Sequence, residues 1–597
     1  MKRTVSLFSL ALLAIAGLAQ APADKRLAGL DTFVNKVLKD WHAAGVTIAV
    51  VEKDKVVYTG GFGYRDLEHK LPVTENTEFA IGSCTKAFTA SLIGMLEAEG
   101  KLDIDKPVRN YLPELKFQNE YTNDHATLRD MMCHRTGLPR HDLSWYASWA
   151  TREEFLKRIE FLEPTAELRA KWQYNNFMFM AQGVVLEKIT GKSWEENMRE
   201  RIFKPLGMDN TNLSVKDMEK TPDHSLAFVT RDSSIKAIPY RNIDAMGPAG
   251  SINTSAKDMA KWLITWINNG KFQGKEIVPA AYRTEAMTIQ MAVGGGTPDP
   301  ANPDVHVAGY GLGWFISSYR GHYRVEHGGG IDGFITTTGF FPSDSIGIFI
   351  SSNQGGVTSS IRNWIADRLL KLSYRNWNKT LLDAAKKANE AAKAIQKNTG
   401  SNTVAGTQPS HELKAYAGVF SNPGYGKIEI KYENGKLSSV FNTMPIRIEH
   451  VHYDQFNAEA EDPSMEGGEP MRFTFLTDSK GSIDRLTIPF EAGVKDIEFQ
   501  RESVAVAVTQ GDMKKFEGNY EMEIAPGNFA KFYLKGDKLY AFIEGQPEYE
   551  LIPTGKNKFD LKIAKGYSVE FEANEKGEII SATFVQPNGN FKAKRKN

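Results

Sequence analysis

The sequence predicts an α+β domain, an antiparallel sheet with helices, followed by two small all-β barrel or sandwich domains. Three observations support this prediction. Runs of β-forming residues lie near residue 50 and between residues 310 and 352, with helical patterns between them, so both ends of one segment can complete a single sheet. A linker rich in Thr, Ser, Gly and Asn occupies residues 398–410. Beyond it, short alternating strands occur in two similar copies.

Residues 1–21 carry the pattern of a secretory signal peptide. Lys2 and Arg3 precede an apolar stretch that runs from residue 5 to 18, and small residues follow as far as Ala21. This stretch is shorter than the ~20 residues of a membrane-spanning helix, so we expect cleavage rather than an uncleaved anchor. The mature protein is therefore expected to be secreted or periplasmic, without an integral membrane span.

Composition excludes several classes of protein. The 597 residues are 41% hydrophobic and 24% charged, which is typical of globular domains, and the length is sufficient for more than one of them. Because 73 Lys and Arg balance 73 Asp and Glu, nothing indicates a nucleic-acid partner. Cys84 and Cys133 are the only cysteines, which excludes a disulfide framework but leaves open whether these two pair.

Residues 22–375 contain the elements of the first domain. Alternating runs on either side of a short turn predict a hairpin. Apolar residues from Phe88 to Leu96 recur at helical spacing and predict a helix that begins at Ser83 and ends before Gly100. The predicted strands are residues 46–51, 55–64, 310–317, 323–327, 334–341 and 346–352.

Residues 376–410 are predicted to be a helix, at about 381–396, and a linker. The chain then repeats itself, because the pattern of residues 416–420 recurs at 516–520. Two further matches follow in the same order, 434–437 with 536–539 and 473–486 with 569–584. We therefore expect two β modules, at 411–505 and 507–597.

Ser83 and Lys86 are the strongest candidates for chemistry. Their spacing at the start of a helix places both side chains on one face, where an amine can reach a hydroxyl. A serine hydroxyl becomes a good nucleophile when a neighbouring base takes its proton, and a desolvated lysine can be that base. The helix start also presents free backbone N–H groups to an oxyanion.

Two further motifs follow in the chain, Tyr174-Asn175-Asn176 and His327-Gly328-Gly329. With Ser83-Cys84-Thr85-Lys86 in this order, the sequence resembles the serine β-lactamase and penicillin-binding protein superfamily. The similarity covers about residues 28–375 and is greatest to the class C β-lactamase branch, which includes esterases and D-aminopeptidases.

The resemblance implies a role for each motif residue. Ser83 would be the nucleophile that accepts the acyl group, and Tyr174 would share the base role with Lys86 and return the proton to the leaving group. A neighbouring ammonium should lower the pKa of Tyr174, and which of the two is the resting base stays open. Asn176 would hydrogen-bond the substrate, and the backbone N–H groups of Ser83 and Gly330 would form the oxyanion hole.

The third motif departs from the Lys-Thr-Gly that is common in β-lactamases. His327 stands in place of a lysine whose permanent charge accompanies the carboxylate of a β-lactam, and a histidine is expected to be only partly charged at neutral pH. The resemblance implies that His-x-Gly, here completed by Gly329, is more usual in esterases and D-aminopeptidases. His327 and Gly329 are therefore expected to shape the substrate site.

The two C-terminal modules resemble the lipocalin-like β modules of D-aminopeptidases, in which such modules border or enter the active-site cleft. The alternative is a stabilising or surface-attachment role.

Several other signals do not carry a function. Gly328, Gly330 and Gly333 fit the letters of a dinucleotide fingerprint, but a strand follows where that motif needs a helix. Cys84 is expected to be a core residue. Asp142 and Asp258 are expected to be caps or surface residues. No cofactor is required, and no metal site is expected from the three neighbouring histidines, His125, His134 and His141.

The sequence thus predicts an exported serine hydrolase that cleaves an ester or a D-amino-acid peptide or amide bond through a Ser83 acyl-enzyme. Two alternatives remain at this point. One is a class C type β-lactamase or a D,D-carboxypeptidase, and the other is a non-catalytic protein that binds the cell wall or a partner.

Overall fold

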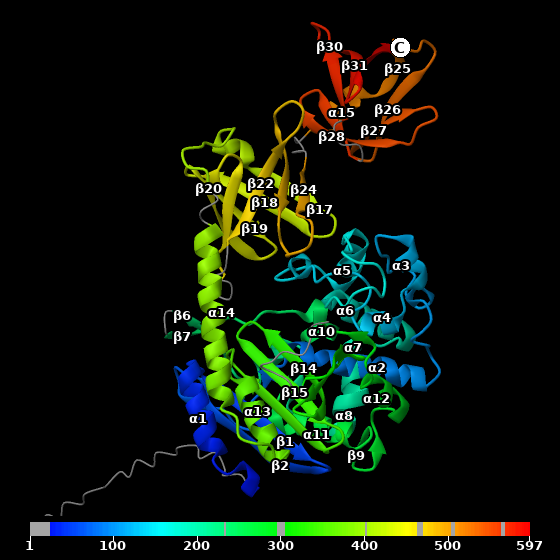
Figure 1. The fold of residues 1–597 in the computed structure, drawn as a ribbon. Helices are drawn as coiled ribbons and strands as arrows, with labels where there is room; N and C mark the ends of the chain where they lie inside the picture. Colours follow the sequence, from blue (N-terminus) through cyan, green and yellow to red (C-terminus); the bar gives the residue numbers. More distant parts are fainter. Residues whose placement is uncertain are drawn as a thin grey trace, which may run out of the picture.

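A computed structural model describes residues 24–231, 234–294, 305–399, 403–462, 470–502, 508–562 and 567–596. The predicted signal peptide at residues 1–21 lies outside these ranges. The described chain forms a sheet-and-helix domain, a long helix α14 (Trp377–Thr399) and two β-barrels (Figure 1). The predicted fold class, an α+β domain followed by two small all-β domains, is confirmed, and both small domains are closed barrels of eight strands.

A nine-stranded antiparallel sheet forms the centre of the first domain. The first and last predicted strands pair in it, with Val46 opposite Ser352, so the sheet does close on strands from both ends of the segment. Its strands, in spatial order, are β11 (Met291–Ala292), β12 (Ala308–Tyr310), β13 (Phe315–Tyr319), β14 (His322–Ile331), β15 (Phe334–Phe341), β16 (Ile346–Ser352), β1 (Gly45–Glu52), β2 (Lys55–Asp66) and β3 (Leu71–Pro72).

The strand predicted at residues 310–317 is instead two strands, β12 and β13. The chain turns back at Gly313, whose φ of +80° suits a residue without a side chain. At Gly311 a Cβ atom would lie 2.1 Å from the carbonyl oxygen of Ala286, so this glycine permits a close backbone approach. A run of β-forming residues does not reveal such a turn, which explains the difference.

Helices cover both faces of the sheet. Along β1, Val46, Ile48 and Val50 face a core shared with α1 (Leu30–Trp41) and α13 (Thr358–Leu369). The residues between them, Ala49 and Val51, face a second core shared with α2 (Thr85–Ala98) and α11 (Ala256–Ile267). Burial on both faces is why β1 is apolar at successive positions instead of alternating.

The middle of the domain is mostly helical and surrounds α2, which is buried along most of its length. The predicted helix at 83–99 begins as a 3-10 turn, η2 (Gly82–Cys84), before it continues as α2. The other helices of this region are α3 (Glu120–His125), α4 (Leu128–Met132), α5 (Arg152–Arg158), α6 (Asn176–Thr190), α7 (Trp194–Met198), α8 (Lys204–Leu206), α9 (Val215–Met218), α10 (Gly247–Gly250) and α12 (Ala280–Ala286). Short strands complete it, namely β4 (Phe79–Ala80), β5 (Thr211–Asn212), β6 (Ala227–Arg231), β7 (Ser234–Ile238), β8 (Asn253–Thr254), β9 (Lys271–Phe272) and β10 (Lys275–Glu276).

The two barrels are built alike, as the sequence repeat predicts. In the first, Arg501 donates hydrogen bonds to backbone carbonyls that include those of Ala415 and Ala417. In the second, Arg595 does the same to Lys515 and Glu517. Barrel 1 comprises β17 (Gly418–Asn422), β18 (Gly426–Glu433), β19 (Lys436–Phe441), β20 (Met444–His452), β21 (Gln455–Ala460), β22 (Met471–Thr477), β23 (Ile483–Ile488) and β24 (Ile497–Arg501). Barrel 2, preceded by the short helix α15 (Gln510–Met513), comprises β25 (Gly518–Met522), β26 (Phe529–Lys535), β27 (Lys538–Ile543), β28 (Tyr549–Gly555), β29 (Lys558–Leu561), β30 (Ser568–Ala573), β31 (Ile579–Gln586) and β32 (Gly589–Lys596).

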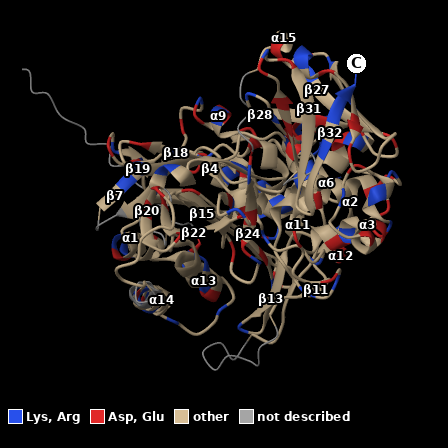
Figure 2. Ribbon diagram, turned by 90° about the horizontal axis from the view of Figure 1, so that it is seen from above, with Lys and Arg blue, Asp and Glu red and all other residues tan. Residues whose placement is uncertain are grey.

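The two barrels relate differently to the first domain. The apolar interior of barrel 1 belongs to the same continuous core as α2 and α6, whereas barrel 2 has a core of its own. Seen from above, Lys and Arg are mixed with Asp and Glu over all parts of the molecule (Figure 2). In the part of the chain that the structure describes, no helix combines the length and the apolar character that a membrane crossing requires.

Candidate active site

Ser83 and Lys86 lie next to each other at the junction of η2 and α2. The Nζ atom of Lys86 is 3.0 Å from Ser83 Oγ, 2.7 Å from Asn176 Oδ1 and 2.8 Å from the carbonyl oxygen of Ala249. The last two atoms can only accept hydrogen bonds. A neutral amine has two N–H groups for these two acceptors, so its lone pair is left for the hydroxyl proton of Ser83. The arrangement is that of a base beside its nucleophile.

The surroundings of Lys86 favour this neutral form. Its side chain is fully buried, and this desolvation holds the pKa of the amine well below its usual value. The positive charge of Arg140 lowers the same pKa further. Burial therefore gives Lys86 the lowered pKa that the predicted base role requires.

Tyr174 corrects one expectation. The phenol is fully buried, and burial raises its pKa above the ordinary tyrosine value, although a hydrogen bond with Ser83 acts in the opposite direction. The ring lies 4.9 Å from Lys86 Nζ, but a neutral amine has no charge with which to stabilise a phenolate. The prediction of a lowered pKa was wrong because it neglected burial. Of the two candidate bases, the structure favours Lys86 in the resting state.

Asn176 links the nucleophile pair to a carboxylate. Its Oδ1 accepts from Lys86, and its Nδ2 donates to Asp142 Oδ1 at 2.8 Å. Asp142 also accepts from Arg140 Nε at 2.7 Å and from Trp145 Nε1 at 2.9 Å. Asp142 was expected to be a cap or surface residue rather than an acid in catalysis; it begins a short 3-10 turn, and its carboxylate also fixes the orientation of Asn176.

His327 is buried on β14 and makes two hydrogen-bond contacts. Its Nε2 lies 2.8 Å from the hydroxyl of Tyr310, and its Nδ1 lies 2.6 Å from the carbonyl oxygen of Gly328. Burial lowers the pKa of His327 to about 3. The ring is therefore neutral at pH 7, and the expected partial charge was wrong because the imidazole is desolvated.

Gly329 and Gly330 allow β14 to touch the nucleophile turn. A Cβ atom on Gly329 would lie 1.9 Å from the carbonyl oxygen of Ile81 and 3.1 Å from the backbone nitrogen of Ser83. Gly82 has a φ of +50°, and a Cβ atom there would lie 2.9 Å from the backbone nitrogen of Gly330. The backbone nitrogens of Ser83 and Gly330 are thus brought to the same small region of the cleft.

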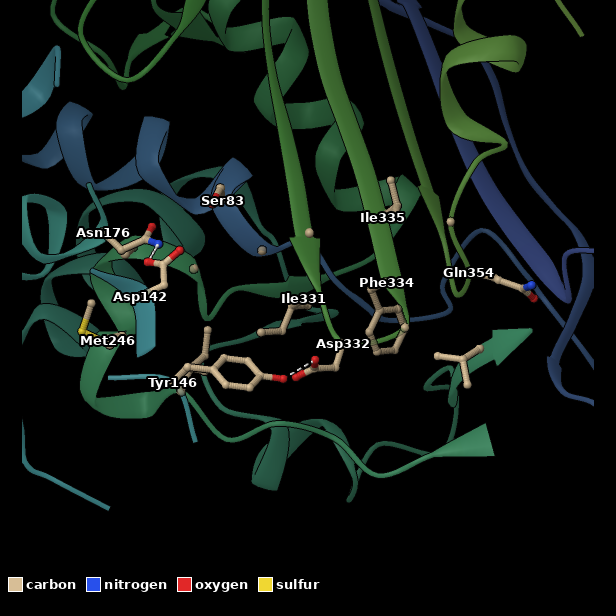
Figure 3. A pocket seen from close by; sticks show the side chains of 18 of the residues that line it. Ser83, Asp142, Tyr146, Asn176, Met246, Ile331, Asp332, Phe334, Ile335 and Gln354 are labelled. Atoms are coloured by element: carbon tan, nitrogen blue, oxygen red, sulfur yellow. Dashed lines mark hydrogen bonds between the residues drawn. The ribbon is translucent and has the colours of Figure 1, made fainter. Parts of the chain in front are cut away.

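Ser83 lines two cavities, of about 710 Å³ and about 640 Å³. The first also contains Asn176 and Asp142, and Figure 3 shows these two beside the serine, with the turn between β14 and β15 below it. The second contains Tyr174 and His327. Ser83, Asn176, Tyr174 and His327 therefore line these cavities, and Ser83 belongs to both of them. Lys86 and Gly329 line neither cavity, and Lys86 is buried beside the serine.

Barrel 1 contributes directly to this cleft. The loop between β23 and β24 places residues 491–494 on the wall of the second cavity. The carboxylate of Glu491 accepts hydrogen bonds from the backbone N–H groups of Arg140 at 3.1 Å and His141 at 2.8 Å. We call residues 140–147 the cleft segment.

Other barrel 1 residues hold the same segment. The hydroxyl of Tyr425 lies 2.7 Å from His141 Nδ1, and the Oγ of Ser144 donates to the carbonyl oxygen of Gly424. Asn442 donates to the carbonyl oxygens of Leu143 and Tyr146. The cleft segment, which carries Arg140 and Asp142, is therefore bound to barrel 1 along most of its length.

Arg140 is the principal cleft residue that the sequence analysis missed. Its guanidinium lies 4.8 Å from the centre of the Tyr174 ring, and the residue lines both cavities. Arg140 lies inside the 28–375 range of the family resemblance but in none of its three motifs. No sequence pattern indicates the contact of Glu491 with Arg140, because Glu491 lies 351 residues further along the chain.

The remaining candidates take structural positions. His134 is buried against Tyr174, with ring centres 4.3 Å apart, and its Nδ1 accepts from the backbone N–H of Asn175. The expectation that Asp258 is a cap or surface residue was wrong, because Ser255 caps α11 and Asp258 is buried in the first turn, where it accepts from the backbone N–H of Asn210. Cys84 and Cys133 are both free and buried, and burial raises the pKa of the Cys84 thiol to about 12.

Two family models match parts of this chain. The family model described as "Beta-lactamase" matches residues 30–371, and a domain of unknown function, DUF3471, matches residues 402–501 in the region of barrel 1. "Unguisins hydrolase ungD'" of Aspergillus campestris is 29% identical over 67% of this chain and 77% of its own length. "Protein flp" of Staphylococcus aureus strain MW2 is 24% identical over 54% of this chain and 62% of its own length.

Among solved structures, the octameric penicillin-binding protein homologue from Pyrococcus abyssi has a similar fold. Its TM-score is 0.53 at 22% sequence identity, over 79% of this chain and 100% of that one. The family resemblance predicted from the three motifs is confirmed. Because the matching model covers more than half of the sequence, this chain belongs to the Beta-lactamase family.

Proposed function

We propose that this protein is an exported serine hydrolase that cleaves an ester or a D-amino-acid peptide or amide bond through an acyl-enzyme on Ser83. One observation carries the proposal: Lys86, buried and favoured in its neutral form, lies 3.0 Å from Ser83 Oγ with both of its N–H groups directed to other acceptors. Export rests on the sequence pattern of residues 1–21.

The reaction has two steps. Ser83 Oγ attacks the substrate carbonyl while its proton passes to Lys86, and the oxyanion is held by the backbone N–H groups of Ser83 and Gly330. The proton then reaches the leaving group through Tyr174, whose hydroxyl is hydrogen-bonded to Ser83, and the C–N or C–O bond breaks. In the second step water attacks the acyl-enzyme while Lys86 takes its proton, and the bond between the acyl carbon and Ser83 Oγ then breaks. Lys86 returns the proton to Ser83 Oγ, and the acid product leaves.

The third motif supports an ester or amide substrate rather than a β-lactam. His327 is neutral and buried, so it does not supply the permanent positive charge that a lysine would place beside a β-lactam carboxylate. The two unguisins hydrolases among the relatives also carry a hydrolase name. A class C type β-lactamase or D,D-carboxypeptidase remains the second candidate, since the family includes such enzymes.

The decisive experiment is the mass of a covalent adduct after reaction with a fluorophosphonate, compared between the wild type and Ser83→Ala. We expect one adduct on Ser83 in the wild type and none in the variant. A chromogenic cephalosporin, a p-nitrophenyl ester and a D-alanine anilide then separate the substrate classes. Rapid turnover of the cephalosporin would support the β-lactamase alternative, and equal activity of wild type and Ser83→Ala on every substrate would support a binding protein.

A further inference from the structure

The two cavities on either side of Ser83 receive different parts of a substrate. Tyr174, which passes the proton to the leaving group, lines only the second cavity, so the leaving group departs there. Asn176 lines only the first. The acyl part of the substrate, which stays bonded to Ser83, therefore occupies the first cavity of about 710 Å³. This assignment rests on the proposed function.

The acyl-side cavity is lined by apolar side chains from several separate elements. Figure 3 shows Ile331 and Phe334 projecting from the turn between β14 and β15, with Met246 opposite them. Strand β6 and the segment before α10 complete the wall. The principal apolar residues are Ile331, Phe334, Val229, Ile243, Met246 and Trp145.

The carboxylates on this wall are already paired. Asp332 accepts from the Tyr146 hydroxyl at 2.6 Å and from Arg241 Nε at 3.2 Å (Figure 3 shows the first of these contacts). Asp142 is held by Arg140 and Asn176. Both carboxylates are thus already ion-paired with arginines, and the guanidinium of Arg140 lies on the same wall, so a substrate ammonium there meets a positive charge and no unpaired carboxylate.

The apolar wall continues beyond the first cavity. A neighbouring cavity of about 310 Å³ shares Trp145, Ile243 and Met246 with it. These three apolar residues line both spaces, so apolar surface borders the first cavity and its neighbour.

We propose that this cavity is a subsite for a bulky apolar acyl group that carries no free ammonium next to the scissile carbonyl. Its ligand is an amino-blocked or internal peptide residue with an aromatic or large aliphatic side chain. Burying such a side chain on an apolar wall favours binding, whereas a free ammonium beside it finds both carboxylates already ion-paired and Arg140 on the same wall. The enzyme would then cleave within a peptide or behind a blocked residue, rather than release a free N-terminal residue.

The test compares three p-nitroanilides, each as D and L forms: N-acetyl-phenylalanine, N-acetyl-alanine and phenylalanine with a free amino group. We expect kcat/KM for the blocked phenylalanine substrate to exceed each of the other two by about tenfold or more in the preferred stereochemical series. Equal values for blocked alanine and blocked phenylalanine, or a preference for the free amine, would overturn the inference.

Two variants locate the effect in the cavity. Ile331→Gln at the end of β14 and Val229→Gln on β6 place polar groups on two separate elements of the wall, and each should reduce the ratio of kcat/KM for the phenylalanine and alanine substrates by about tenfold. Ile580→Gln on β31 is the control, because Ile580 is exposed on barrel 2, and it should keep the wild-type ratio. Unchanged ratios in both cavity variants would also overturn the inference.

Fluorophosphonate labelling of Ser83 separates this inference from the proposed function. Labelled enzyme that lacks the substrate preference contradicts only the subsite. A chain that folds but neither labels nor hydrolyses any of the substrates contradicts the proposed function itself.

Discussion

At the scale of single residues, burial decides the protonation states of the motif side chains. The order of the three motifs, together with the family resemblance that it implies, predicted Ser83, Lys86 and Tyr174. It did not give their protonation states, because these depend on how much water the folded chain removes from each group. Burial makes Lys86 a base, keeps Tyr174 a phenol and keeps His327 neutral.

Lys86→Met should lower kcat/KM by about 10²–10⁴-fold, the usual contribution of a general base. In the wild type, kcat/KM should rise with pH through the pKa of Lys86, which lies well below its ordinary value of 10.5, because only the neutral amine can take the proton. The measurement is a pH–rate profile on a p-nitrophenyl ester. Lys188→Met, which removes an exposed lysine on α6, should match the wild type.

The same lysine links stability to pH. Between the lowered pKa of folded Lys86 and the ordinary value, the unfolded chain binds one more proton than the folded chain, so this group's contribution to stability decreases as pH falls through that window. The Tm of the wild type relative to Lys86→Met should therefore fall as pH is lowered. A constant difference in Tm across the window would contradict a depressed pKa.

The positive charge of Arg140 contributes to the lowered pKa of Lys86. Its charge disfavours the protonated form of Lys86, so Arg140→Met should raise the pKa of Lys86 and move the acidic limb of the kcat/KM profile to higher pH. Arg140→Lys keeps the charge and should keep the limb close to its wild-type position. A profile that does not move in Arg140→Met would limit Arg140 to a structural role through Asp142.

At the scale of elements, the critical contact is that of β14 with the nucleophile turn. Gly329→Ala places a Cβ atom 1.9 Å from the carbonyl oxygen of Ile81, so the strand must move away from Ser83. Loss of an oxyanion donor costs about 10²–10³-fold in kcat, and we expect a decrease of that size. Gly328→Ala is the comparison on the same strand, because its Cβ atom would meet nothing closer than 3.7 Å. Its effect should be much smaller.

The loop between β23 and β24 is a second such element. Glu491→Ala removes the acceptor of two backbone N–H groups in the cleft segment and should lower kcat/KM by about tenfold, since hydrogen bonds to a charged group contribute about 1.5–3 kcal/mol. Glu498→Ala on β24 is the matched control, because Glu498 is an exposed glutamate of the same barrel. Equal kinetics for the two variants would show that the cleft segment keeps its position without Glu491.

Local signals account for what the sequence predicted correctly. The hairpin of β1 and β2, the helix after Ser83 and the repeat of the barrels each depend on neighbouring residues or on a direct repetition. The contacts of Arg140 with Glu491, and of Tyr146 with Asp332, join segments far apart in the chain, and no periodicity or spacing indicates them. The division of residues 310–317 into two strands was missed for a related reason, since a close approach to Ala286 requires the turn.

At the scale of the whole molecule, the two barrels should differ in their importance, although they share one design. Barrel 1 shares its core with the first domain and holds the cleft segment, whereas the core of barrel 2 is made only of its own residues. Separate cores allow independent folding, while a shared core does not.

A chain that ends after residue 502 should therefore fold and keep kcat/KM within about twofold of the full-length value, because no described residue of barrel 2 lines either cavity beside Ser83. A chain that ends after residue 399 exposes the apolar surface of the shared core, frees the cleft segment and should lose activity and solubility together. The measurements are kcat/KM and Tm of both truncated chains. Full activity of the chain that ends after residue 399 would support an attachment role for barrel 1. Loss of activity in the chain that ends after residue 502 would show that barrel 2 contributes to catalysis.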